Sequence, residues 1–108
     1  MCNKIYKIKS MKMTEVEKII KENESEIRAM GVKEIYIFGS VARGSATDKS
    51  DVDCFVVFDE KAKVGFLKLA RLQIYLEEKL KATVDLGTKN SLHRDLKAQI
   101  LKEAIRVA

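Results

Sequence analysis

Apolar residues recur at helical spacing near the start of the chain. Between Thr14 and Gly31 they fall every three or four positions, which is the period of an amphipathic helix: Val16, Ile19, Ile20, Ile27 and Met30. Thr14 and Glu17 form a capping-box pair that predicts the start of this helix. Gly31 suits the position just past its end.

Strand-like spacing follows. Residues from about 33 to 38 predict a strand, with Ile35 and Ile37 on one face. A short turn or helix is predicted after this strand, ending at residue 44. Residues 45–50 form a polar loop in this interpretation, because they combine serine, threonine and charged side chains.

The second half of the chain repeats the alternation of strand and helix. Residues 51–58 predict a second strand, because their apolar run is too short for a typical helix. A charged turn over 59–63 leads to a helix over 64–80, and 82–86 predict a third strand that Gly87 breaks. The expected core face of the helix is Phe66, Leu69, Leu72, Leu76 and Leu80.

A last helix is expected after the third strand. Asn90 or Ser91 is its predicted cap, and its apolar positions are Leu92, Leu96, Ile100 and Ala104. The order of elements predicts an α/β (α+β) domain, a small mixed sheet with helices packed on one face. If the helices cover one face, the other face of the sheet is open for a site.

Charge is concentrated at the start of the chain. Residues 1–13 contain four lysines and no acidic residue, whereas the whole chain has 21 basic and 16 acidic residues. We therefore divide the chain into a basic arm, 1–13, and a nearly neutral domain, 14–108. A basic arm adds affinity for phosphate-rich partners but reads no base sequence, so no sequence-specific nucleic-acid binding is predicted.

Neither a membrane segment nor an oxidising compartment is indicated. No stretch approaches the roughly 20 apolar residues that a membrane helix needs, and the first residues lack the apolar block of a secretory signal. Cys2 and Cys54 are the only cysteines and are expected to be free, reduced thiols. We expect a cytoplasmic protein.

A glycine-rich turn after the first strand is the first candidate site. Gly39 ends the strand and Ser40 begins a helical turn, where unpaired backbone N–H groups suit a phosphate. Arg43 and Gly44 close the turn. An ordinary turn is the alternative, because Gly-Ser after a strand is a weak signal alone.

Three aspartates form the second candidate site. Asp51 and Asp53 alternate at the start of the second strand, so both project to one face and can jointly hold hard cations. Asp85 shares a face of the third strand with Thr83, opposite Val84 and Leu86. If the third strand neighbours the second, Asp85 meets the other two carboxylates. Solvated acids at strand ends are the alternative.

The ordered set Gly39-Ser40-x-x-Arg43-Gly44, Asp51-x-Asp53 and Val84-Asp85-Leu86 resembles the minimal nucleotidyltransferase family of the DNA polymerase beta-like superfamily. The resemblance implies that fold over about 14–107. It further implies that Gly39 and Ser40, in the turn closed by Arg43 and Gly44, bind the triphosphate and that Asp51 and Asp53 hold the metals, two Mg²⁺ ions.

Further roles are implied by the same resemblance. Asp85 matches the third acidic position, a metal ligand that activates the acceptor, and Arg43 supports the phosphate site. ATP is the implied substrate. The family includes antitoxins encoded beside HEPN-type ribonuclease toxins, some of which adenylylate a tyrosine of the toxin.

Three functions stay open from the sequence. The first is an antitoxin enzyme that transfers AMP to a partner protein. The second is a nucleotide-binding antitoxin that acts by contact alone. The third is transfer to a small molecule, for which another copy of the chain would complete the acceptor pocket. A chain of 108 residues leaves no room for a separate acceptor domain, so a partner or a homo-oligomer is expected to supply that wall.

Overall fold

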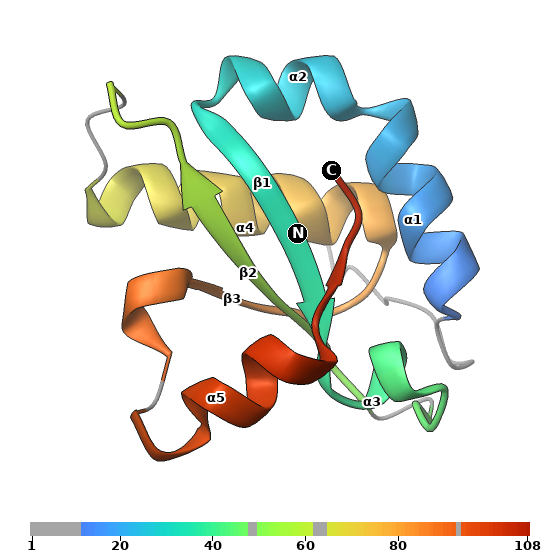
Figure 1. Ribbon diagram of the computed structural model, residues 1–108. Helices are drawn as coiled ribbons and strands as arrows, with labels where there is room; N and C mark the ends of the chain where they lie inside the picture. The colour runs from blue at the N-terminus through green and yellow to red at the C-terminus, as the bar shows by residue number, and fades with distance from the viewer. Residues whose placement is uncertain (1–11, 48–49, 62–64, 93) are drawn as a thin grey trace.

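A four-stranded mixed sheet organises the protein, as seen in a computed structural model that describes residues 12–47, 50–61, 65–92 and 94–108 (Figure 1). The strands are β1 (Val32–Phe38), β2 (Val52–Phe58), β3 (Val84–Thr88) and β4 (Ile105–Arg106). Their spatial order is β3-β2-β1-β4. β1 pairs antiparallel with β2 and β4, while β2 and β3 are parallel. The predicted class and the mixed sheet are confirmed.

Three helices pack on one face of this sheet: α1 (Met13–Glu22), α2 (Glu24–Ala29) and α4 (Phe66–Leu80) (Figure 1). The remaining helical elements are α3 (Gly39–Arg43), the 3-10 turn η1 (Lys89–Ser91) and α5 (Arg94–Glu103). α3 and α5 lie next to each other at the end of the sheet where β1 stops. The sheet therefore has one covered face and one face on which a site can form.

Strand alternation decides which side chains fill the core. Ile35 and Ile37 of β1 are fully buried, and their cross-strand partners are Val56 and Cys54 of β2. In β3, Val84 and Leu86 continue this apolar layer. The layer packs on buried side chains of the helices: Val16, Ile20, Ile27, Leu72, Leu76 and Leu80. No buried residue among those described is polar or charged.

The first predicted helix is two helices. α1 ends at Glu22 and α2 begins at Glu24, because the Asn23 side chain donates to the Ile19 carbonyl at 2.8 Å and competes with the helical backbone. The predicted cap is also wrong. Lys12 occupies the cap position, and its N–H donates to Glu15 Oε1 at 3.2 Å, so Thr14 lies inside the helix.

The predicted core face of α4 is correct except at its first residue. Leu72, Leu76 and Leu80 are buried, and Leu69 packs against the core. Phe66 is 84% exposed, because the first turn of α4 extends beyond the strands (Figure 1). Helical spacing alone does not show where a helix passes the edge of its sheet.

The region after α4 differs most from the prediction. Gly87 does not break β3, because pairing with β2 continues through Gly87 and Thr88. Ser91 bonds the backbone of Thr88 at 2.9 Å and closes the turn η1, rather than capping α5. α5 has no buried residue, and Leu96 is 51% exposed. The two-residue strand β4 was not predicted.

Part of the sequence interpretation falls outside the described residues. Most of the predicted arm, including Cys2, lies there, and the arm stays a prediction. Cys54 is a free, buried thiol, as expected. Among the described residues, none of the helices has the length and apolar character needed to cross a membrane.

Candidate active site

Gly39 joins β1 to α3 in a conformation that favours glycine. Its φ is 75°, in the left-handed region. A Cβ at this position would lie 3.1 Å from Cγ of Asp53 and nearer still to its Oδ2. Gly44 ends α3 with a similar φ of 76°, but a Cβ there would meet nothing within 4 Å. Gly39 is therefore the glycine that lets the turn approach the carboxylate.

Strand register brings two of the predicted aspartates together. Asp53 and Asp85 are direct partners in the parallel pairing of β2 with β3. Asp53 also lies opposite Phe38, the residue before Gly39, so the turn and the acids meet at one end of the sheet. The expectation that the third strand neighbours the second is confirmed. Asp51 precedes β2 and is exposed.

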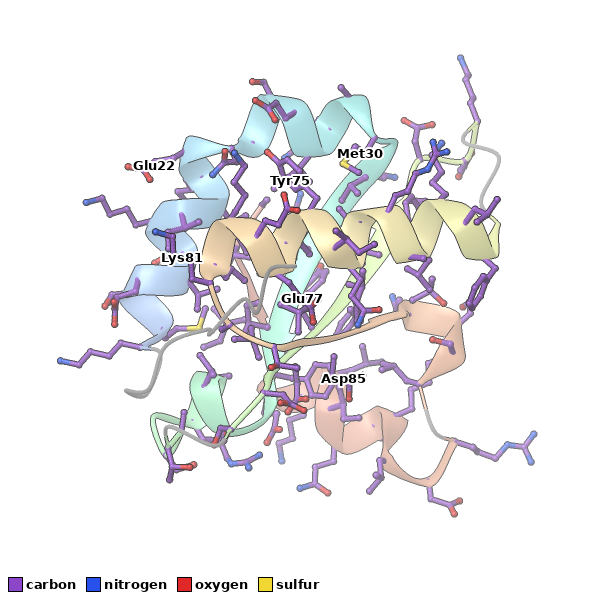
Figure 2. All side chains as sticks on the ribbon, turned by 180° about the vertical axis from the view of Figure 1, so that it is seen from behind. Glu22, Met30, Tyr75, Glu77, Lys81 and Asp85 are labelled. Carbon is purple, nitrogen blue, oxygen red and sulfur yellow. The ribbon has the colours of Figure 1, made fainter. Side chains whose placement is uncertain are left out.

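Side chains of α4 hold β3 in place beside Asp85. Gln73 Nε2 donates to the Val84 carbonyl at 3.0 Å, and Val84 N–H donates to Glu77 Oε2 at 3.0 Å. The N–H and the carbonyl of Val84, the residue before Asp85, are thus both held by side chains on the covered face. Figure 2 shows Glu77 on α4 and Asp85 beyond the strand from it. Asp85 is exposed, as its place on the uncovered face requires.

The electrostatics of the site centre on Asp53. Partial burial raises the pKa of its carboxyl, and the neighbouring charges of Asp85 and Asp51 raise it further. The Arg43 guanidinium acts in the opposite direction and lowers this pKa. Asp85 and Asp51 are therefore each close enough to Asp53 to repel its carboxylate, and a bound cation would relieve that repulsion.

The residues fit a divalent metal by their chemistry. Aspartate oxygens are the ligands that Mg²⁺ uses in proteins, Asp53 and Asp85 are register partners, and Asp51 lies two residues before Asp53 at the same end of the sheet. In the parts of the chain that the structure describes, no three acidic, histidine or cysteine side chains are already arranged around a metal position. Asp51, Asp53 and Asp85 stay the predicted ligands.

One residue of the site was not predicted. Arg43 Nη1 lies 3.0 Å from Glu103 Oε1, and the Gly39 N–H donates to the same oxygen at 3.3 Å. Glu103 is 64 positions from Gly39, and nothing in the charged pattern of α5 distinguishes it from its neighbours. No local sequence signal predicts this contact.

Comparison with known proteins identifies the family of this fold and site. The protein-family model named nucleotidyltransferase domain matches residues 13–107 of the sequence. The chain belongs to the nucleotidyltransferase domain family. The predicted family is thus confirmed, and the chain is a nucleotidyltransferase by membership. It is 40% identical over 96 residues to the protein adenylyltransferase MntA of Thermococcus cleftensis, covering 88% of this chain and 95% of that protein.

Solved structures agree with this assignment. A structure assigned as a minimal nucleotidyltransferase matches with a TM-score of 0.73 and 35% identity, over 88% of this nucleotidyltransferase and 95% of that chain. A complex of a tri-AMPylated HEPN toxin of Shewanella oneidensis with an MNT antitoxin contains a chain with the same fold. That match has a TM-score of 0.60 and 23% identity, over 91% of this chain and 72% of the other.

Proposed function

We propose that this nucleotidyltransferase transfers AMP from ATP to a hydroxyl group on a partner protein, a tyrosine of a HEPN-type toxin. The observation that carries the proposal is the register of β2 and β3, which sets Asp53 directly beside Asp85 next to the Gly39 turn. In a member of this family, that arrangement joins a phosphate-binding turn to a pair of carboxylates. The similarity to a protein adenylyltransferase supports AMP as the transferred group.

The chain's own groups divide the work in this proposal. Backbone N–H groups and the Ser40 hydroxyl of the 39–44 turn bind the β- and γ-phosphates, and Arg43 neutralises their charge. Asp51, Asp53 and Asp85 hold Mg²⁺, which when bound stabilises the charge on the entering and leaving oxygens.

Asp85 has the additional task of receiving the proton of the acceptor hydroxyl. The acceptor oxygen then bonds to the α-phosphorus as the bond from that phosphorus to the pyrophosphate oxygen breaks. The exposure of Asp85 and Asp51 supports an acceptor on another molecule, because a large partner can reach them from solvent. Positioning by the partner converts a bimolecular encounter into an oriented reaction.

The test is transfer of labelled AMP to a HEPN-type partner purified together with the chain. We expect Mg²⁺-dependent labelling of a partner tyrosine, located by mass spectrometry and lost in the partner's tyrosine-to-phenylalanine variant. Labelling should also be lost with Ser40→Ala or Asp53→Asn, while complex formation is retained.

A partner that binds and is inhibited, but acquires no AMP with Mg²⁺ and ATP present, would contradict transfer. That result would favour an antitoxin that acts by contact. Labelling of a small molecule in place of the partner would keep the transferase and remove the protein acceptor.

A further inference from the structure

Glu103 occupies the donors of the phosphate-binding turn. A single carboxylate oxygen, Oε1, accepts from both the Gly39 N–H and Arg43 Nη1, at 3.3 and 3.0 Å. Glu103 is the last residue of α5, and its side chain is 24% exposed against 53% for Arg43. The contact joins two elements that are adjacent in space, α3 and α5 (Figure 1).

These donors are the ones that the proposed function assigns to the triphosphate. A carboxylate and a phosphate cannot both accept full-strength hydrogen bonds from the same N–H and guanidinium donors. Two anions held by the same donors would also repel each other. Nucleotide must therefore displace Glu103 from Gly39 and Arg43, or bind without them.

The attachment of α5 permits such a displacement. α5 has no buried side chain, and Leu96 and Leu101 are 51% and 38% exposed. The residues after it are held firmly: Val107 is buried, and its N–H donates to the Ile35 carbonyl at 2.9 Å. Glu103 thus lies between a loosely packed helix and an anchored strand, where its release disturbs little of the core.

We propose that Glu103 competes with the triphosphate for the same donors. In the free chain Glu103 occupies the Gly39 N–H and the Arg43 guanidinium, and it releases both groups when ATP binds. This inference rests on the proposed function, because it takes the 39–44 turn as the triphosphate site. It predicts that Glu103 weakens ATP binding. A residue that merely positions Arg43 for phosphate would have the opposite effect.

The experiment compares nucleotide affinity in variants of the full chain by calorimetry, with Mg²⁺ and about 0.15 M salt to screen distant charges. Glu103→Gln removes the charge and keeps the shape, while Glu103→Ala removes the contact. Glu22→Gln, an exposed acid on α1, is the charge-matched control. ATP is compared with AMP, which lacks the β- and γ-phosphates, and thermal melting verifies folding.

We expect both Glu103 variants to bind ATP more tightly, on the order of fivefold, the scale of a partly exposed ion pair. AMP affinity and the Glu22→Gln control should be unchanged. Equal or weaker ATP binding by the Glu103 variants, with normal binding by the unaltered chain, would overturn the inference and leave the proposed function intact. Absence of ATP binding in every form would overturn both.

Discussion

The two faces of β2 show how one strand can serve both stability and chemistry. Val52, Cys54 and Val56 point to the helix-covered face and are at most 1% exposed. Asp53, between them, points to the other face beside Asp85. Phe55, on the same face as Asp53, is also only 1% exposed and stacks on Tyr36. Alternation along the strand therefore separates the helix-covered layer from a face that is buried around Phe55 and can bind ligands at the end near Asp53.

The difference also explains why the carboxylates occur on only one face. Burial on the covered face strongly raises the pKa of the Cys54 thiol, so a charged group there would be costly. On the other face, the pKa of Asp53 is also raised, but solvent and a cation can reach the cluster. Repulsion between carboxylates is therefore tolerated at the site, whereas it would not be tolerated in the core.

The largest effect expected on the open face is loss of transfer in Asp85→Asn. The change removes a charge without removing volume from an exposed position, so the melting temperature should hardly move. Transfer of labelled AMP should fall by at least about a hundredfold, since even outer groups that support metal ligands contribute roughly 10–100-fold. Thr83→Ala, on the same face, is the control. Normal transfer by Asp85→Asn would show that the β2–β3 register does not build the site.

Substitutions on the covered face should lower stability and leave activity unchanged. Ile35→Ala truncates a fully buried side chain and should lower the free energy of unfolding by about 2–5 kcal/mol. Ile35→Val should cost about 0.5–1.5 kcal/mol. Urea unfolding measures both, and activity per folded molecule should stay normal. A large loss of activity without loss of stability would break the division between the faces.

The paired glycines of α3 provide a sharper contrast. Gly44→Ala should cost roughly 1–2 kcal/mol, because the left-handed conformation at this position is unfavourable for alanine, although the added Cβ meets no neighbour. Gly39→Ala has the same backbone cost and also forces the Asp53 carboxylate to move. We expect Gly39→Ala to lose both stability and nucleotide binding, and Gly44→Ala to lose only a little stability. If Gly39→Ala and Gly44→Ala had the same melting temperature and the same nucleotide affinity, the close approach of Gly39 to Asp53 would be contradicted.

The smallest expected effect is a gain in stability from Asp53→Asn without metal. The folded pKa of Asp53 lies above its unfolded value, so the ionised carboxylate destabilises the fold near neutral pH. The variant should melt a few degrees higher there, about 2–5 °C, since about 1 kcal/mol shifts Tm by roughly 4–8 °C at this size. The gap should close as pH falls through the folded pKa. A gap that is constant or reversed from pH 8 to pH 4 would disprove the repulsion.

Much of this arrangement was predictable from local pattern. The alternation around Ile35 and in 51–58 predicts β1 and β2, and the acidic positions follow from the same period of two. Whether Asp85 lies beside these acidic positions depends on the order of the strands in the sheet, which the sequence alone does not determine. The family resemblance rests on the ordered combination of motifs and predicted the fold correctly.

The errors arose where tertiary contacts override local pattern. Asn23 interrupts a continuous helical period through a side-chain bond to Ile19, and Phe66 follows that period into solvent. β4 has only two residues, too few to show alternation. Glu103 reaches Gly39 across 64 positions, a contact that only the folded chain creates.

Metal-dependent ATP binding tests the central claim that the open end of β2 and β3 is a nucleotide site. ATP is titrated into the unaltered chain and into Asp51→Asn/Asp53→Asn, with and without Mg²⁺, by calorimetry. We predict that Mg²⁺ strengthens ATP binding clearly in the unaltered chain and has little effect in the double variant. The same metal-dependent affinity in both proteins would contradict the claim.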